Sequence, residues 1–123
     1  MRKATPGNQL QRVLTRLRGK ESVRGADLRG LWLCYWNLSG TDLRRVNFHS
    51  ANLSHADLSG ADLREADFRH ARLVSAKLRG AIVDGALFTG APVQGADFSE
   101  VKGLAPHQAA AFAQHGAKVD ATD

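Results

Sequence analysis

Apolar and polar positions alternate along the middle of this chain in a pattern that restarts every five residues, from Ala26 to Glu100. Each unit has a small residue, then Asp or Asn, then Leu or Phe at its centre, and then two mostly polar residues, as in Ala56-Asp57-Leu58. Residues two apart in an extended segment point the same way, so the centre and the small residue face inward while the Asp or Asn faces water. The alternation restarts after each centre, which requires a bend there.

Glycine marks the expected bends. A residue able to adopt a positive φ turns the chain at little cost, and glycine recurs at the second position after a centre. An amphipathic α-helix is excluded, because a period of five does not keep one face of a 3.6-residue helix apolar. The glycines at this position are Gly25, Gly30, Gly40, Gly60, Gly80, Gly85, Gly90 and Gly95.

A longer period of twenty residues is superposed on the five. Phe48, Phe68 and Phe88 show it clearly. Four units per turn would place each residue n above residue n minus 20, in a square tube of about four coils and on the order of 20 Å in length. The inward centres then form four apolar columns: Val23, Leu43, Leu63, Val83; Leu28, Phe48, Phe68, Phe88; Leu33, Leu53, Leu73, Val93; and Leu38, Leu58, Leu78, Phe98.

The consecutive Ala-Asp-Leu units resemble those of the pentapeptide repeat family, and the resemblance extends over residues 21–100. It implies an all-β solenoid, namely a right-handed quadrilateral β-helix. Repeats of this kind bury their apolar side only by stacking on their neighbours. Leu31 and Trp36 put large side chains where Ala is usual, so we expect the first coil to be wider and closed by another segment.

The length of the chain predicts one domain, with residues 1–20 as a basic N-terminal cap. Their apolar residues have the spacing of an amphipathic helix, with Asn8 as N-cap and Gly19 as the stop. An Arg-rich segment without acids is also typical of an organellar transit peptide. The cap is favoured, because the apolar stripe ends where the first coil must be covered. The stripe consists of Leu10, Val13, Leu14 and Leu17.

Residues 101–123 predict a second, smaller cap. His107 to Gln114 form an Ala-rich stretch with Pro106 in the first turn and Gly116 after the end, which favours a short helix. Phe112 is expected to pack on the last coil. Beyond Gly116 the residues are small or charged, and we expect them to be frayed.

The formal net charge of +5 is placed unevenly along the chain. Residues 1–20 contain six Lys or Arg and no acid, whereas residues 21–100 contain nine Lys or Arg and ten Asp or Glu. Outward arginines stack along one edge, either as a solvated face neutralised by nearby acids or as a docking site for an acidic partner. This stripe comprises Arg24, Arg44, Arg45 and Arg64 on one side and Arg29, His49 and Arg69 on the next, near Asp42, Asp62, Glu65 and Asp67.

Apolar residues also occupy outward positions. Trp32 does so in the first coil, and Ile82, Leu87 and Pro92 do so in the last. We expect the C-terminal segment to cover the last coil, with another molecule as the alternative. A homodimer through an end or through the last coil would be one such arrangement.

No catalytic, metal or cofactor motif is recognisable, and no small-molecule substrate is indicated. The outward Asp and Asn residues are better explained as acceptors for nearby backbone amides than as acid-base pairs. His49, His55 and His70 point outward, and His49 and His70 approach one another without a completing acid. Cys34 is an incidental outward thiol, and a lone cysteine fits a reducing compartment such as the cytoplasm. No apolar stretch approaches the ~20 residues of a membrane span.

These features favour a non-catalytic interaction or scaffold module whose partner is another protein. The resemblance offers one alternative, because some members imitate B-form DNA and protect DNA gyrase. Another is nonspecific nucleic-acid binding through the basic residues 1–20. An enzyme is the least expected class.

Overall fold

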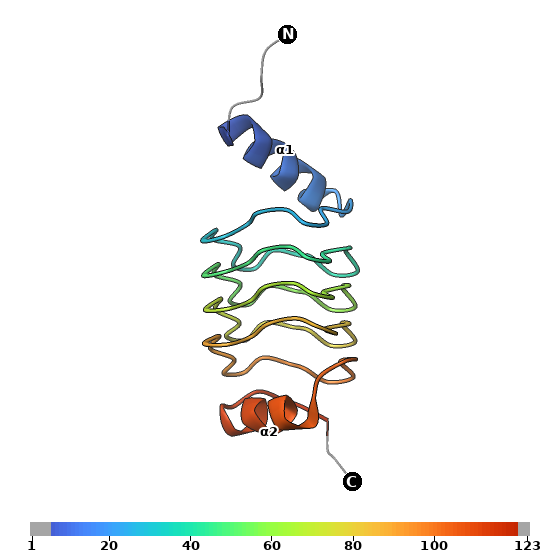
Figure 1. Ribbon diagram of the computed structural model, residues 1–123, viewed down its shortest axis with the longest axis vertical. Helices are drawn as coiled ribbons and strands as arrows, with labels where there is room; N and C mark the ends of the chain where they lie inside the picture. The colour runs from blue at the N-terminus through green and yellow to red at the C-terminus, as the bar shows by residue number, and fades with distance from the viewer. Residues whose placement is uncertain (1–5, 121–123) are drawn as a thin grey trace.

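A four-sided coil with a helix closing each end makes up the computed structural model, which describes residues 6–120 (Figure 1). Helix α1, Pro6–Arg18, lies over the first coil, and α2, Pro106–Gln114, lies under the last. Parallel bridges join successive coils, and the bridged residues are twenty apart, as in Asn47 with Asp67. The predicted repeat of four units per turn is therefore confirmed.

Every corner of the coil is a tight turn closed by a backbone hydrogen bond. At one corner the Ala56 amide donates to the Leu53 carbonyl over 3.0 Å, and His55 between them has a φ of 63°. At the next corner down the chain Gly60 has a φ of 67°. A positive φ at the third turn residue alone is the mark of a type II turn. The predicted glycine bends are confirmed.

Non-glycine residues adopt the same left-handed conformation at the remaining corners, which the glycine pattern did not indicate. This conformation costs a residue with a side chain ~1–2 kcal/mol. Coil-to-coil hydrogen bonds hold it, since these residues donate their amides to the next coil; the His55 amide donates to the Val74 carbonyl over 3.0 Å. Glu100, in the last coil, donates its amide to Asp120 Oδ2 instead, over 2.8 Å. The corner residues are Tyr35, Arg45, Ser50, His55, Glu65, His70, Ser75 and Glu100.

The interior is a continuous column of centres and small residues. Every predicted centre from Val23 to Phe98 is buried. The Phe68 ring stacks between those of Phe48 and Phe88, with centroids 5.0 and 5.2 Å away. We number the sides of the coil by their first centres: Val23 for the first side, Leu28 for the second, Leu33 for the third and Leu38 for the fourth.

Helix α1 covers the open end of the first coil with its apolar stripe. Leu17 is fully buried, while Leu10, Val13 and Leu14 are partly buried against the core. The large residues expected to widen this coil, Leu31 and Trp36, also pack against the core. The guanidinium of Arg18 lies over the Trp36 ring, 5.0 Å from its centroid.

The two ends of α1 differ from the prediction in detail. The helix begins at Pro6, so Asn8 is not its N-cap but lies in the first turn; proline is well suited to a helix start because its fixed φ is already helical. At the other end the Lys20 amide donates to Leu17 and the Glu21 amide to Arg16, over 3.0 and 2.9 Å. This is a Schellman motif in which Lys20, not Gly19, takes the positive φ.

Helix α2 plugs the opposite end. Phe112 is buried with its ring centroid 4.7 Å from that of Phe98 and 5.4 Å from that of Phe88. The chain bridges Ile82 through Lys102 on the first side and Asp97 through Lys118 on the fourth. Helix α2 therefore takes the place of the second and third sides of a further coil.

We predicted that the residues after Gly116 are frayed, but Lys118 pairs with the last coil. The Lys118 amide donates to the Ala96 carbonyl, and the Phe98 amide donates to the Lys118 carbonyl, each over 2.8 Å. Unpaired backbone groups at the edge of the last coil attract this short segment, whatever its side chains. The prediction also included residues 121–123, which lie outside the described part of the chain.

Candidate functional site

The outward Asp and Asn residues brace the corners of the coil. Asp62 Oδ1 accepts the backbone amide of Arg64 over 3.2 Å, and Asn52 Oδ1 accepts that of Ser54 over 3.1 Å. This confirms the interpretation that these residues accept hydrogen bonds from nearby backbone amides. The same bond is made by Asp27, Asn37, Asp42, Asn47, Asp57, Asp67 and Asp97.

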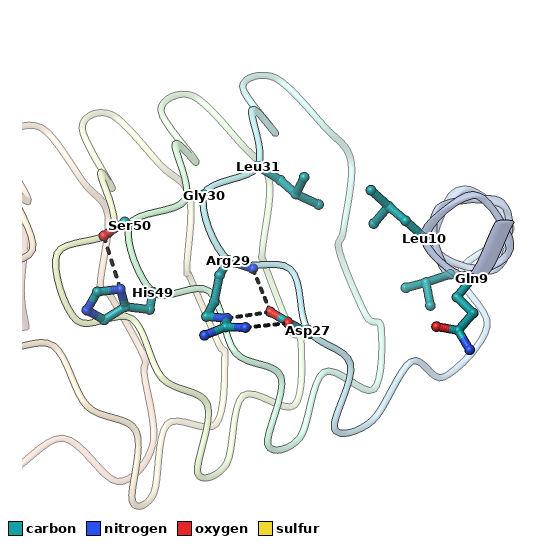
Figure 2. Close-up of a pocket in the computed structure, with 9 residues that line it drawn as sticks. Gln9, Leu10, Asp27, Arg29, Gly30, Leu31, His49 and Ser50 are labelled. Atoms are coloured by element: carbon teal, nitrogen blue, oxygen red, sulfur yellow. Dashed lines mark hydrogen bonds and ion pairs between the residues drawn. The ribbon is translucent and has the colours of Figure 1, made fainter. Parts of the chain in front are cut away.

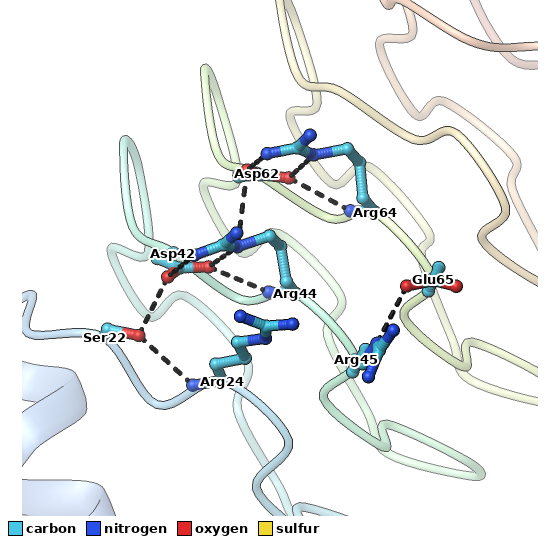
Figure 3. Close-up of polar contacts among 8 residues, drawn as sticks. All are labelled: Ser22, Arg24, Asp42, Arg44, Arg45, Asp62, Arg64 and Glu65. Carbon is cyan, nitrogen blue, oxygen red and sulfur yellow. Dashed lines mark hydrogen bonds and ion pairs between the residues drawn. The ribbon is translucent and has the colours of Figure 1, made fainter.

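On the first and second sides, arginines fold back onto these same carboxylates. Arg64 donates from Nε and Nη2 to the two oxygens of Asp62, over 2.9 and 2.6 Å. Figure 3 shows Arg44 between Asp42 and Asp62, the farther carboxylate being 3.7 Å away. The same fork joins Arg29 to Asp27 and Arg69 to Asp67, and Arg45 pairs with Glu65 over 2.8 Å.

These ion pairs neutralise most of the arginine stripe that the sequence indicated. Arg24 differs, because Ser22 stands where the units of Arg29, Arg44, Arg64 and Arg69 carry Asp. Within residues 6–120 no carboxylate lies within ion-pair distance of its guanidinium. Sequence reasoning placed the acids close by but did not distinguish the paired arginines from the free one.

The forks lower the pKa of the carboxyls that they hold. Hydrogen bonding from Arg44 brings the pKa of Asp42 well below its usual range, and Arg64 and Arg69 lower the pKa of Asp62 and Asp67 in the same way. Because the pKa of these carboxyls is lower in the folded state than in the unfolded state, their ionised forms stabilise the fold. This contribution is complete at pH values above the ordinary Asp pKa of ~3.9. That contribution is lost as the pH falls from there through the folded pKa.

We therefore expect the melting temperature to be nearly constant from about pH 8 to pH 5 and to fall below about pH 4. In Arg69→Gln the melting temperature should fall less steeply with acid than in the wild type, because Asp67 loses the donor that lowers its pKa. Arg72→Gln is the matched control, since Arg72 forms no ion pair with any residue from 6 to 120. Melting curves followed by circular dichroism across this pH range provide the measurement, and equal declines in the two variants would contradict the argument.

The third side of the coil has a different surface. Its units, 31–35, 51–55, 71–75 and 91–95, contain no Asp or Glu. Trp32 is 78% exposed and Tyr35 is 72% exposed. The Tyr35 ring stacks on His55 of the next coil, with centroids 4.7 Å apart. Sequence reasoning singled out Trp32 but missed Tyr35, although its corner position already placed it outward.

The expected cover over the last coil is absent from Leu87, which is 48% exposed on the second side. Ile82 and Pro92 are half-buried. Helix α2 packs beneath the coil to close its end and does not wrap around its side (Figure 1). The prediction that the C-terminal segment covers this surface is therefore wrong for Leu87.

A groove of about 710 Å³ runs between α1 and the second side of the coil. Leu10 and Leu31 point toward one another across it, as Figure 2 shows. Its charged and ring groups already have partners: Arg29 is forked to Asp27, and Ser50 Oγ lies 3.1 Å from His49 Nδ1. The groove therefore offers an apolar recess without a free reactive group.

The remaining candidate groups are scattered. The His49 and His70 rings meet edge to face with centroids 5.4 Å apart, as their positions predicted. Cys34 is a half-buried free thiol whose Sγ lies 3.9 Å from the Asn52 carbonyl oxygen. Residues 6–120 contain no group of three or more His, Cys, Asp or Glu placed to hold a metal ion. In the same residues, neither helix has the length and apolar character needed to cross a bilayer.

The repeat geometry agrees with a known family. A model of pentapeptide repeats matches eight copies over residues 24–64, 47–85 and 66–102. The chain belongs to the pentapeptide repeat family. Its fold is accordingly the right-handed quadrilateral β-helix that the sequence predicted, with a helical cap at each end.

Solved structures of pentapeptide repeat proteins are similar to this one. A protein from the thylakoid lumen of Arabidopsis thaliana is 31% identical over 85% of each chain, with a TM-score of 0.36. HetL from the cyanobacterium Nostoc sp. strain PCC 7120 is 28% identical over 67% of this chain and 48% of HetL, with a TM-score of 0.44. QnrB1, a fluoroquinolone resistance protein, is 17% identical over 65% of this chain and 48% of its own, with a TM-score of 0.27.

This pentapeptide repeat protein thus spans about half the length of HetL and of the QnrB1 chain. Comparison with curated proteins gave no match. The choice between scaffold, DNA mimic and nucleic-acid binder therefore depends on the surface of this chain itself.

Proposed function

We propose that this pentapeptide repeat protein is a non-catalytic interaction module whose partner is another protein. The observation that carries the proposal is the third side, where Trp32 and Tyr35 are exposed on a surface without acids. Trp and Tyr are enriched among the residues that dominate binding energy, and exposed apolar surface on a soluble protein commonly marks an interaction site.

The rigidity of the coil supports the same proposal. The backbone beneath Trp32 is held by hydrogen bonds of 2.8 Å from the Leu33 amide to the Asn52 carbonyl and 2.9 Å from the Asn52 amide to Leu31. A surface that is already ordered loses little conformational entropy on binding.

We place the protein in the cytoplasm, as the single cysteine suggested.

Affinity capture from a lysate of the source organism tests this proposal. The wild-type protein should recover a specific partner that the double variant Trp32→Ala, Tyr35→Ala does not. Lys77→Ala, an exposed change on the fourth side, is the matched control and should recover the partner normally. Equal recovery by all three proteins, or none above a blank matrix, would contradict the proposal.

A DNA mimic is the main alternative, and we expect the protein not to inhibit the supercoiling activity of DNA gyrase. DNA carries one charge per ~1.7 Å, so a ~20 Å rod would need on the order of ten net negative charges to imitate it. Residues 21–100 contain nine Lys or Arg against ten Asp or Glu, and forks such as Arg64 on Asp62 neutralise the acids locally. A supercoiling assay with an acidic mimic as positive control measures this. Inhibition that disappears when the aspartates become asparagine would favour mimicry.

Nucleic-acid binding through residues 1–20 is less well supported. Helix α1 is docked on the coil, and two of its arginines are engaged there. Arg16 lies 3.5 Å from Glu21, and Arg18 lies over Trp36. The basic segment is therefore better described as a cap with a positive outer surface.

A further inference from the structure

The arginines that directly follow a centre form a natural comparison set. They are Arg24, Arg29, Arg44, Arg64, Arg69 and Arg79. Most of them fork onto the Asp two residues earlier, and Arg79, whose unit has Lys77 there, instead reaches Glu100 over 3.2 Å. Arg24 is the member of this set without a carboxylate partner in residues 6–120. Arg24 therefore occupies the same position in its unit as the paired arginines, but its unit contains no Asp to pair with it.

The neighbours of Arg24 explain why no other acid replaces the missing one. Ser22 accepts the Arg24 amide over 3.4 Å and donates to Asp42 Oδ2 over 2.9 Å. Asp42 is already occupied by the fork from Arg44, and Glu65 by Arg45. Figure 3 shows the Arg24 side chain extended toward Arg44, with no bond from its guanidinium.

Arg24 also lines a groove where α1 meets the first side of the coil. The groove has a volume of about 350 Å³ and combines the arginines Arg16 and Arg24 with the apolar residues Val13, Val23 and Ala26. The acids nearest to it already have arginine partners, Glu21 with Arg16 and Asp42 with Arg44. The charged side chains that line the groove itself are Arg16 and Arg24, and both are positive.

We propose that this groove binds an acidic segment of a partner protein, with a partner carboxylate on Arg24 in the place that Asp42 and Asp62 take beside Arg44 and Arg64. An apolar neighbour in that segment would lie against Val13 and Val23. The next two units of the first side hold a carboxylate at this corner, as Arg44 and Arg64 show. The planar guanidinium matches it through two parallel hydrogen bonds.

This inference rests on the proposed function, since it names one chemical class of partner and a second surface that contacts it. The third side and the Arg24 groove belong to the same first coil. They lie on opposite sides of that coil, so the groove is a contact separate from the one made by Trp32 and Tyr35.

Fluorescence anisotropy with a labelled oligo-glutamate peptide that carries a central leucine tests the inference. Arg24→Ala should weaken binding by about tenfold, as expected when a charged hydrogen-bonded pair is lost. Arg69→Ala removes an equal charge from a paired arginine on the second side and should leave the affinity within about twofold of the wild type.

Ser22→Asp gives the sharper test, because it removes no positive side chain. It supplies the missing acid within the unit, so Arg24 should close on it as Arg44 closes on Asp42, and peptide binding should fall by about tenfold. Thr89→Asp adds the same charge at an exposed position on the second side and serves as the control. Both variants should melt at or above the wild-type temperature, which confirms that they fold.

Two outcomes would overturn the inference by showing that the attraction is not specific to an acidic protein segment. One is equal loss of peptide binding in Ser22→Asp and Thr89→Asp, which would indicate attraction by overall charge only. The other is binding of single-stranded DNA with the same affinity and the same dependence on Arg24, which would indicate a general polyanion surface. If Ser22→Asp still captures the partner recovered by the wild type and binds the peptide unchanged, the interaction function stands and the Arg24 groove is not its site.

Discussion

Phe68→Ala should lower the free energy of unfolding by about 3–5 kcal/mol, the range for truncating a fully buried phenylalanine. Phe68 is completely buried, and its ring stacks on Phe48 and Phe88 with centroids 5.0 and 5.2 Å away. The backbones of the neighbouring coils are fixed by hydrogen bonds of 2.8 Å from the Phe48 amide to Asp67 and 2.7 Å from the Phe68 amide to Leu87. The cavity therefore cannot collapse easily, which places the loss at the large end.

Urea denaturation followed by circular dichroism measures this loss. Leu87→Ala is a close control, because Leu87 is on the same side and 48% exposed; it should cost less than about 1 kcal/mol. A loss below about 1 kcal/mol for Phe68→Ala would be incompatible with a stacked aromatic column in the interior.

Loss of the N-terminal cap should have the second large effect. We expect deletion of residues 1–20 to cause aggregation or cooperative loss of structure, because Leu17 is fully buried over the first coil and its removal exposes apolar side chains and unpaired coil edges. Size-exclusion chromatography with light scattering and thermal melting would detect both. A truncated rod that stays monomeric and equally stable would show that this segment is a tail, and would favour the transit-peptide or nucleic-acid interpretation.

A point variant in the full chain separates packing from chain length. Leu17→Asp should lower the free energy of unfolding by several kcal/mol, since it buries a charge without a partner. Thr15→Asp introduces the same charge on an exposed part of α1 and should have little effect. Equal melting temperatures for the two variants would show that α1 does not act as a cap.

The interaction surfaces were only partly predictable. The register correctly placed Trp32 and the arginines outward, because the alternation within a unit decides which side chains face water. The sequence contains Ser22 in place of an Asp before Arg24, but only the structure showed that no other carboxylate of residues 6–120 pairs with the Arg24 guanidinium. Tyr35 was missed because its corner position suggested a bend and not a binding surface.

By itself, the sequence determined the repeat, the four-unit turn and the inward column, because each unit of five residues carries its own inside and outside and the aromatic positions recur every twenty residues. It also predicted both helical caps from their apolar spacing and their Pro and Gly signals. The tertiary structure decided what depends on contacts between coils. Coil-to-coil hydrogen bonds force His55 and Tyr35 into a conformation that local preference disfavours. Unpaired backbone groups at the edge of the last coil form hydrogen bonds with Lys118. Leu87 stays exposed because α2 closes the end of the coil and does not cover its side.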